Sequence, residues 1–487
     1  YQTSKPEFMD NIIFNLVKEK PQLVNSVFLV DSFDKLDKGI FSDREIDYIQ
    51  HRIAQNTRLI PLNYFYHWNF IVITGKDDEG TDELESIRRT GAKLADKVKE
   101  NELDFLTLID HSGGKDTTTA LVEGLLMALY SFDKYKNNTE PTKPLKRLNI
   151  FNKHYKEQDI EELDIVMQAV AMTRDFVNEP ASTLTATRFA DEITRAAHVS
   201  GLNVELYRKE DLQKMNMGGI LAVNQGSEEP PVLIKLEWKH PKAKNKKPMA
   251  FVGKGVVYDS GGLSIKPTQK SMDYMKSDMA GGATIAALMY TIARNKMPIH
   301  AIAMIPATDN RINSRAYSPG DVITMHNGKS VEVMNTDAEG RLIMADALSY
   351  IDKFEPEFVL SIATLTGSAS RAIGPYGIAA MGNAKEKYFD HLTESGMRTY
   401  ERIVRFPFWD DYGSLLKSDI VDIKNVGGES AGAITAGKFL ENFTNHPFIH
   451  LDIAGVAFVH KTRHYYKFGS SGVGVRLLFD FVKSLTK

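Results

Sequence analysis

The segment Asn335-Thr336-Asp337-Ala338-Glu339-Gly340-Arg341-Leu342 carries two carboxylates and a guanidinium on alternate positions. It follows a β-branched run and leads into an apolar pattern of helical spacing. This order places it in a loop at the carboxyl end of a strand, where open α/β sheets bind their ligands. In such a loop Asp337 and Glu339 can converge on one metal ion, and Arg341 can hold an anion beside them. The alternative is an acidic helix N-terminus that complements the macrodipole, with Arg341 in solvent.

A second segment, residues 249–262, begins as an apolar strand that contains Lys254 between two glycines. A buried lysine has a lowered pKa, so its neutral amine can bind a metal ion. The alternative is a lysine that extends its amine to solvent. Asp259 stands at the end of this strand, before a Ser-Gly-Gly loop. Lys266 and Asp278 follow, and the alternative role of Asp278 is a carboxylate at the N-terminus of the next helix.

These residues share a position at a strand end or a helix start. The set is Lys254, Asp259, Lys266, Asp278, Asp337, Glu339 and Arg341. A single tetrahedral ion would leave several of the carboxylates uncompensated, so the set predicts more than one divalent cation. By themselves, the residues therefore indicate a two-metal hydrolase.

Three stretches, in this order, resemble the cytosolic leucyl aminopeptidase family. They are Val-Gly-Lys-Gly-x-x-x-Asp-Ser-Gly-Gly-x-x-x-Lys-Pro from Val252, Met-x-x-Asp-Met from Met275, and the octapeptide from Asn335. Further similarity covers the chain from about residue 123 to its end, including the segment His-Leu-Asp-Ile-Ala-Gly from His450. The resemblance implies an enzyme that hydrolyses the N-terminal peptide bond of peptides, with a preference for leucine and other apolar residues.

The resemblance also implies how the site residues divide their work. Two ions, zinc or manganese, would be held by Lys254, Asp259, Asp278 and Glu339 and by Asp259, Asp337 and Glu339. A water shared by the two ions would be the nucleophile. Lys266 would stabilise the oxyanion that develops on the scissile carbonyl, and Arg341 would bind a bicarbonate ion that relays the proton.

The family's side-chain pocket is matched by Met275, Asn335, Thr364, Gly367 and Ala454, which implies a mostly apolar cavity of leucine size. Methionine adapts to several apolar shapes, so more than one side chain would fit. Ordinary core packing is the alternative role of Met275. The family also implies a homohexamer built as a dimer of trimers.

Length and composition limit the class of protein. With 487 residues the chain exceeds what one hydrophobic core usually serves, so two domains are expected. A net charge of −3 indicates no general attraction to nucleic acid or to an anionic membrane, and no apolar run is long enough to span a membrane. The absence of cysteine excludes disulfides and thiolate ligands. The expected location is the cytoplasm, although a chain that starts at Tyr1 leaves room for a removed targeting segment.

Strand-like runs and helical patterns alternate along the chain, which predicts an α/β protein. We expect a smaller N-terminal α/β domain over residues 1–155, a linking helix over 156–178, and a larger catalytic domain over 179–487 with a mostly parallel central sheet covered by helices on both faces. Expected strands of the smaller domain are 27–30, 70–73 and 105–109. Those of the larger domain are 204–207, 219–222, 232–238, 250–257, 301–305, 331–334, 358–363 and 450–453.

The sequence leaves two alternatives to an active aminopeptidase. A DNA-binding regulatory role, known in some bacterial relatives, would need a basic stripe on the N-terminal domain, but the charges there are interspersed. A catalytically silent structural relative is the other alternative, and the presence of the full site set argues against it. The pairs His446/His450 and His460/His464 have metal-like spacing without an enclosed glutamate. His450 is expected on a strand, and His460 and His464 are expected in solvent.

Overall fold

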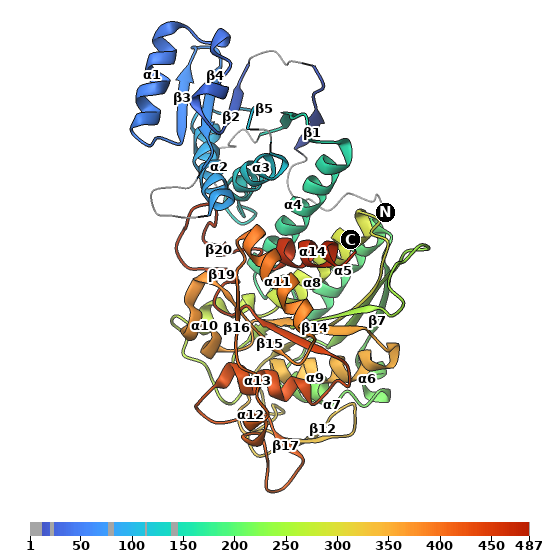
Figure 1. The fold of residues 1–487 in the computed structure, drawn as a ribbon. Helices are drawn as coiled ribbons and strands as arrows, with labels where there is room; N and C mark the ends of the chain where they lie inside the picture. The colour runs from blue at the N-terminus through green and yellow to red at the C-terminus, as the bar shows by residue number, and fades with distance from the viewer. Residues whose placement is uncertain (1–11, 20–23, 76–81, 113, 138–144, 487) are drawn as a thin grey trace. The chain divides into compact units, whose positions relative to one another are not determined.

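The computed structural model describes residues 12–19, 24–75, 82–112, 114–137 and 145–486 (Figure 1). The chain forms two compact units. The smaller unit contains residues 7–171 and 461–468, and the larger unit contains residues 172–460 and 469–487. Helix α4 (Glu157–Asn178) agrees with the predicted linking helix, and the division between the units falls inside it. The predicted domain limits at residues 155 and 178 stay a prediction.

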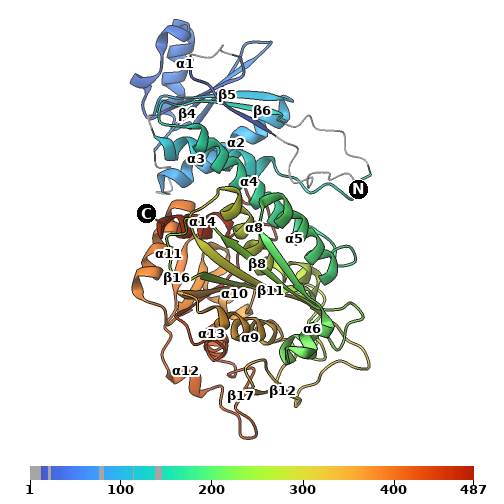
Figure 2. The ribbon, with the colours of Figure 1, turned by 90° about the vertical axis from the view of Figure 1, so that its right-hand side faces the viewer.

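The smaller unit is a six-stranded sheet with helices on both faces (Figure 2). In sheet order its strands are β1 (Ile13–Leu16), β6 (Arg147–Phe151), β5 (Phe105–Asp110), β2 (Ser26–Val30), β4 (Trp68–Ile73) and β3 (Leu59–Asn63). All neighbours are parallel except β4 and β3. Its other helices are α1 (Asp43–Ala54), α2 (Glu83–Glu100) and α3 (Lys115–Leu129). The three strands predicted for this part of the chain are confirmed.

The larger unit is built on a mixed, mostly parallel sheet, as predicted. In sheet order its strands are β16 (Ile403–Arg405), β15 (Ile378–Gly382), β18 (Phe448–Asp452), β14 (Phe358–Ala363), β9 (Met249–Gly253), β11 (His300–Asn310), β8 (Val232–Lys239) and β7 (Asn203–Tyr207). Strand β10 (Gly255–Asp259) also pairs with β11. The central strands β18, β14, β9 and β11 are parallel, and the antiparallel pairs lie toward the edges.

Two small sheets complete the strands of the larger unit. One contains β12 (Val322–Thr324), β13 (Ser330–Glu332) and β17 (Ile423–Lys424), and the other contains β19 (Phe458–Val459) and β20 (Gly469–Ser470). The strand predicted over 331–334 is therefore shorter than expected and lies outside the main sheet. The predictions over 204–207, 232–238, 301–305, 358–363 and 450–453 correspond to β7, β8, β11, β14 and β18.

Helices cover both faces of the main sheet, again as predicted (Figures 1 and 2). One face carries α5 (Ala186–Ser200), α8 (Ala280–Arg294), α11 (Glu386–Thr399) and α14 (Val475–Ser484), and the other carries α7 (Gly218–Asn224), α9 (Gly340–Ile351) and α13 (Gly432–Glu441). Three further short helices are α6 (Lys209–Lys214), α10 (Gly367–Ile373) and α12 (Asp411–Ser414). Among the described residues, no helix has both the length and the apolar character that a membrane crossing requires.

The strand predicted over 219–222 is wrong, because these residues lie in helix α7. A short, fully apolar run has no period that separates a buried strand from a buried helix. Gly219 lets α7 pack closely on α9, since a Cβ on this residue would lie 2.4 Å from the Leu342 carbonyl oxygen. The buried carboxylate of Asp346 accepts the Ile220 N–H at 2.9 Å, which satisfies one donor at the start of the helix.

The single strand predicted over 250–257 is two strands, β9 and β10, interrupted at Lys254. At the interruption the Lys254 N–H donates to the Ile362 carbonyl at 3.1 Å, and the Lys254 carbonyl accepts the Gly282 N–H at 2.7 Å. These bonds join the break to the end of β14 and to the start of α8. Lys254 is therefore fixed by its backbone at the end of β9.

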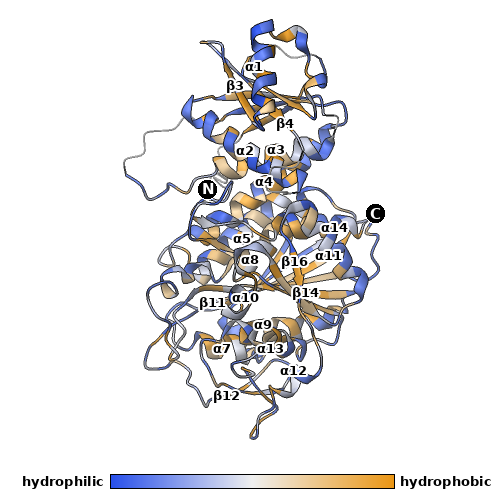
Figure 3. Ribbon diagram, turned by 60° about the vertical axis from the view of Figure 1, so that its left-hand side comes forward, coloured by the Kyte–Doolittle hydropathy of each residue, from blue (hydrophilic) through white to orange (hydrophobic). Residues whose placement is uncertain are grey.

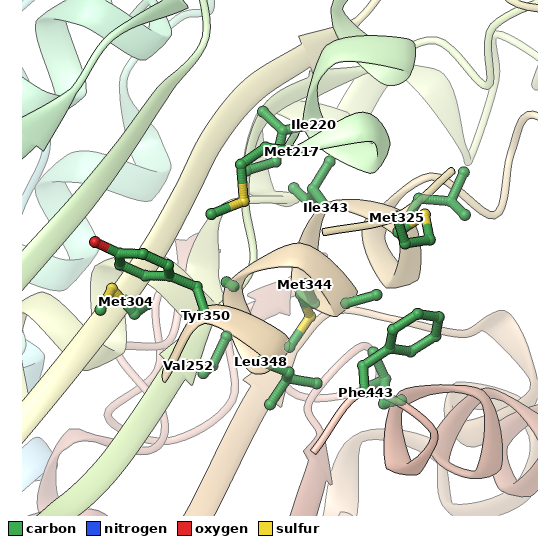
Figure 4. Close-up of a cluster of buried hydrophobic side chains, with 14 of the residues drawn as sticks. Met217, Ile220, Val252, Met304, Met325, Ile343, Met344, Leu348, Tyr350 and Phe443 are labelled. Atoms are coloured by element: carbon green, nitrogen blue, oxygen red, sulfur yellow. The ribbon is translucent and has the colours of Figure 1, made fainter. Parts of the chain in front are cut away.

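Helix α9 is anchored in the hydrophobic core of the larger unit (Figure 4). The side chains that α9 contributes to this core include Ile343, Met344 and Leu348. The same cluster contains Met217, in the turn before α7, and Val252 of β9. Strands β11 and β14 are buried along almost all of their length and appear mainly hydrophobic in Figure 3, as expected for strands covered on both faces. This packing gives a rigid position to the helix that begins directly after Glu339.

Candidate active site

Three segments bring the predicted site residues together at the carboxyl end of the parallel strands. They are the break and end of β9–β10 with Lys254 and Asp259, the following stretch with Lys266 and Asp278, and the start of α9 with Asp337, Glu339 and Arg341. This edge is where parallel sheets place ligands. Gly340 permits the approach of the first and third segments, because a Cβ on it would lie 2.4 Å from Lys254 Cε.

Lys254 lies buried between two carboxylates. Its Nζ is 2.7 Å from Asp278 Oδ2 and 2.8 Å from Glu339 Oε1, and it donates to the Thr364 carbonyl at 3.1 Å. With 3% of its surface exposed it does not extend to solvent. Burial disfavours its charged form, but the facing carboxylates outweigh burial and raise the pKa of Lys254. The prediction of a lowered pKa for Lys254 is therefore wrong when only the protein's own groups act on it. That prediction considered burial and left out these two carboxylates.

Lys266 lies between the other two carboxylates. Its Nζ is 2.8 Å from Asp259 Oδ2 and also contacts Asp337 Oδ1. Asp259, Asp337 and Glu339 each offer an oxygen within 4.8 Å of the oxygens of the other two. The convergence predicted for Asp337 and Glu339 is therefore present, with Asp259 as the third member of the group.

The crowding of negative charge shifts the pKa values of these groups. Burial and repulsion from Glu339 raise the pKa of Asp259 to about 7. Burial also raises the pKa of Asp278 and, with repulsion from Glu339, that of Asp337. Glu339 is the exception, because the two lysines outweigh its burial and lower its pKa. Like charges at this separation are costly unless cations compensate them.

The donor set fits divalent cations. Asp278 Oδ2, Asp337 Oδ1 and Glu339 Oε1 are buried beside a lysine Nζ, yet they accept no hydrogen bond of ordinary geometry from the described residues. Carboxylate oxygens are the hard ligands that ions such as manganese and zinc accept. A cation at this position would also compete with the proton of Lys254. How the ligands divide between two ions stays a prediction.

Arg341 is buried in the first turn of α9, with 6% of its surface exposed, so the alternative of a solvated side chain is wrong. Its Nη1 donates to the Asn425 carbonyl at 2.7 Å, and its buried Nε has no hydrogen-bond acceptor among the described residues. Burial lowers the pKa of Arg341 to about 10, which leaves it cationic at neutral pH. A buried cationic donor of this kind is suited to an anion.

Sequence reasoning missed the polar residues that join the site loops. Asn310, the last residue of β11, donates from Nδ2 to Asp259 Oδ1 at 2.8 Å and to the Thr336 carbonyl at 3.0 Å. Ser264 and Thr336 bind each other reciprocally, through Ser264 N–H to Thr336 Oγ1 at 2.8 Å and Thr336 N–H to Ser264 Oγ at 3.1 Å. Asn310 could have been identified in the same way as Asp259, because each is a polar residue at the end of an apolar strand.

Asn425, which follows β17, is a second missed residue. Its side chain is fully buried; Oδ1 accepts the Met334 N–H at 2.8 Å, and Nδ2 donates to the Asn335 carbonyl at 2.8 Å. Its own carbonyl accepts from Arg341. Asn425 thus holds both the start of the octapeptide and the guanidinium near its end. No local pattern identifies it, because its partners are distant in the sequence.

The five predicted pocket residues come from separate segments of the larger unit. Met275 and Asn335 are half-buried, Thr364 follows β14, Gly367 begins α10, and Ala454 follows β18. Thr364 Oγ1 donates to Asp278 Oδ1 at 2.8 Å, which links one pocket segment to the carboxylate cluster. The role of these five residues in binding a side chain stays a prediction.

The histidines behave as expected. His450 lies fully buried on β18, with Nδ1 2.8 Å from Ser361 Oγ. Burial, together with the charge of Arg341, lowers its pKa to about 3, so the ring is neutral. His460 and His464 are exposed.

The chain is similar to known proteins in both sequence and structure. A family model described as "Cytosol aminopeptidase family, catalytic domain" matches residues 171–479. The chain is 39% identical over 431 residues to the probable cytosol aminopeptidase of Chloroherpeton thalassium, covering 82% of this chain and 84% of that protein. It is 41% identical over 411 residues to that of Syntrophotalea carbinolica, covering 82% of each.

A solved structure has the same fold over nearly the whole chain. The bottromycin maturation enzyme BotP in complex with Mn has a TM-score of 0.83 and 26% sequence identity, over 95% of this chain and 100% of that one. The region that the family model matches contains every segment of the carboxylate cluster. The chain belongs to the cytosol aminopeptidase family and is a metallo-aminopeptidase.

Proposed function

We propose that this enzyme is a two-metal aminopeptidase that removes leucine and other apolar residues from the free N-terminus of peptides. The observation that carries the proposal is the convergence of Asp259, Asp337 and Glu339 within 4.8 Å, beside Asp278 and two lysines. If Lys254 binds an ion as a neutral amine, Lys266 supplies one positive charge against four carboxylates, and a single divalent ion would leave one negative charge uncompensated.

Two divalent ions fit this set, with Asp259 and Glu339 as shared ligands. Lys254 and Asp278 would complete one site, and Asp337 would complete the other. Bound ions would supply Lewis acidity, which lowers the pKa of a water and polarises a carbonyl. Zinc and manganese both suit such ligands, and manganese is the first ion to test because the BotP structure is described as a complex with Mn.

The protein's own groups would orient the peptide around this centre. Asp278, held through Oδ1 by Thr364, would attract the free amine of the substrate. Lys266 stays cationic, because its carboxylate neighbours outweigh burial and raise its pKa, so it can donate to the oxyanion that develops on the scissile carbonyl. Arg341 would hold a bicarbonate ion through its remaining N–H donors, and that anion would take up and return the proton.

The proposals for substrate preference and assembly rest on the resemblance to the family and not on the carboxylate cluster. Met275, Asn335, Thr364, Gly367 and Ala454 would line a mostly apolar pocket for a side chain of leucine size. We also propose a cytoplasmic location, since the similar proteins are named cytosol aminopeptidases, and a homohexamer, which the resemblance of the sequence motifs to the family implies.

A pair of substrates tests the proposed reaction. Leucine amide and its N-acetyl counterpart should be hydrolysed at very different rates, because acetylation removes the basic amine that Asp278 and a metal ion would bind. Alanine amide, as a smaller substrate, should be hydrolysed more slowly than leucine amide. Comparable rates for the free and the acetylated substrate would contradict the exopeptidase assignment.

A further inference from the structure

Asp452, the last residue of β18, has no role in the chemistry described above, yet its buried carboxylate joins two segments of the predicted pocket. It is 2% exposed. Oδ1 accepts the N–H groups of Leu365 and Ala454, each at 3.1 Å, and Oδ2 accepts the Thr366 hydroxyl at 2.8 Å. One carboxylate therefore binds the loop after β14 and the loop after β18 at the same time.

The loop after β14 is held at both ends by buried carboxylates. At its start, Thr364 Oγ1 donates to Asp278 Oδ1 at 2.8 Å, and the Thr364 carbonyl accepts from Lys254 Nζ at 3.1 Å. At its end, Leu365 and Thr366 donate to Asp452. The first carboxylate belongs to the metal cluster, whereas the second accepts its hydrogen bonds, within the described part of the chain, from two backbone N–H groups and a hydroxyl.

Asp452 also supports the helix that follows the loop. Thr366 is the N-cap of α10, and its Oγ1 accepts the Ala369 N–H at 3.1 Å while it donates its own proton to Asp452. Gly367, a predicted pocket residue, is the first residue of that helix. The carboxylate thereby fixes the orientation of the cap and the position at which the helix starts.

We propose that Asp452 is a positioning residue that sets the distance between the two pocket walls formed by Thr364–Gly367 and by Ala454, and thereby the size of side chain that the enzyme prefers. The inference rests on the proposed function, because the pocket itself belongs to it. Asp452 touches neither substrate nor metal in this scheme; it acts by holding, through the N–H groups of Leu365 and Ala454 and the hydroxyl of Thr366, the two loops that contain pocket residues.

Asparagine cannot replace this carboxylate in either orientation. An amide oxygen facing Leu365 and Ala454 would place the amide NH₂ against Thr366, whose hydroxyl proton would lose its acceptor. The flipped amide would place its NH₂ against two N–H donors. Each orientation leaves a buried donor without a partner, which costs enough to shift the loops. Asp452→Asn is therefore a near-isosteric test of the three contacts.

The test compares hydrolysis of leucine amide and alanine amide by Asp452→Asn. We expect the ratio of kcat/KM for leucine to that for alanine to fall by ~10-fold, because side-chain discrimination of this kind depends on close packing in the pocket. Metal content should equal that of the wild type. A variant altered only in stability would lose both activities equally and keep the ratio.

Three further variants make the result specific. Thr366→Val removes the hydroxyl that donates to Asp452 and should lower the leucine-to-alanine ratio similarly. Thr366→Ser keeps a hydroxyl at this position and should retain the wild-type ratio. Asp346→Asn is the matched control, since Asp346 is equally buried and also accepts backbone N–H groups, those of Ile220 and His326, each at 2.9 Å. Asp346 lies outside the predicted pocket, so the leucine-to-alanine ratio of Asp346→Asn should stay at the wild-type value.

Hydrogen exchange gives a readout that does not depend on activity. The amides of Leu365 and Ala454 should exchange at least tenfold faster in Asp452→Asn, while those of β8 should not change. A wild-type ratio in Asp452→Asn, or an equal fall in Asp346→Asn, would overturn the inference. If the wild type releases no leucine from leucine amide, the proposed function fails, and the exchange rates alone then decide whether Asp452 holds the two loops.

Discussion

Each unit of the molecule has an aspartate at the carboxyl end of a parallel strand, followed within a few residues by two glycines. Asp110 ends β5 of the smaller unit, and Asp259 ends β10 of the larger unit. Both are buried. The two residues therefore cannot be told apart by their local sequence. The groups that surround each carboxylate in the folded protein distinguish them.

Several neutral groups donate hydrogen bonds to Asp110. Its carboxylate accepts the Ser112 N–H at 2.7 Å, the Ser112 hydroxyl at 2.6 Å, the Thr118 hydroxyl at 2.5 Å and the Asn152 amide at 2.8 Å. These bonds tie the end of β5 to the start of α3 and to the residue after β6. An acid satisfied in this way organises a loop.

The two carboxylate oxygens of Asp259 have different surroundings. Oδ1 accepts the Gly261 N–H and the Asn310 amide, each at 2.8 Å, whereas Oδ2 lies beside Lys266 among the other carboxylates. This contrast indicates that an acid at a strand end is a candidate metal ligand when other acids converge on its second oxygen. It also predicts that equal substitutions in the two units have different consequences.

The largest effect is expected from Glu339→Ala, which removes the proposed shared ligand. The variant should lose bound metal and essentially all turnover, because both ions depend on this carboxylate. Elemental analysis and a leucine amide assay on the same sample would measure both. Glu357→Ala is a suitable control, since Glu357 precedes β14 at its opposite end and accepts the Tyr388 hydroxyl. Full metal content in Glu339→Ala would argue against a shared ligand.

A smaller loss is expected from Lys266→Ala. If Lys266 donates only to the oxyanion, the variant should retain metal and lose ~10²–10³ in kcat, the usual cost of one such donor. Elemental analysis, size-exclusion chromatography and turnover would separate this outcome from a folding defect. Near-wild-type kcat would show that the oxyanion role is misassigned.

The smallest effect on activity is expected from Asp110→Asn. It should destabilise the smaller unit by ~2–3 kcal/mol, through loss of hydrogen bonds to a charged acceptor, and leave metal content unchanged. Hydrogen exchange of the buried β5 amides would measure the stability. Asp259→Asn, the same substitution in the larger unit, should instead lose metal. An equal loss of metal in both variants would remove the distinction between the two aspartates.

The architecture and the chemistry-bearing residues were largely predictable from the sequence. Strands buried on both faces gave continuous apolar runs, and the acids that close them marked the site. The run at 219–222 was misassigned because a short buried helix has the same composition as a strand. The pKa of Lys254 was assigned in the wrong direction because burial was considered without Asp278 and Glu339.

The residues that hold the site together were less predictable. Asn425 and Asp452 contact segments about 90 positions away in the sequence, and an amide or carboxylate that binds backbone groups leaves no local pattern. Asp452 does close an apolar strand, as Asp259 does, but its partners are N–H groups and a hydroxyl. The sequence shows the type of residue at a strand end; the fold decides what faces it.

The central claim is that hydrolysis depends on divalent ions held by the carboxylate cluster. The direct measurement is turnover of leucine amide by wild-type enzyme after chelation, with the absence of metal verified by elemental analysis, followed by titration with Mn²⁺ or Zn²⁺. We expect activity to vanish with the metal and to return as ions bind, reaching its maximum at two per chain. Undiminished hydrolysis by the metal-free enzyme would contradict the account.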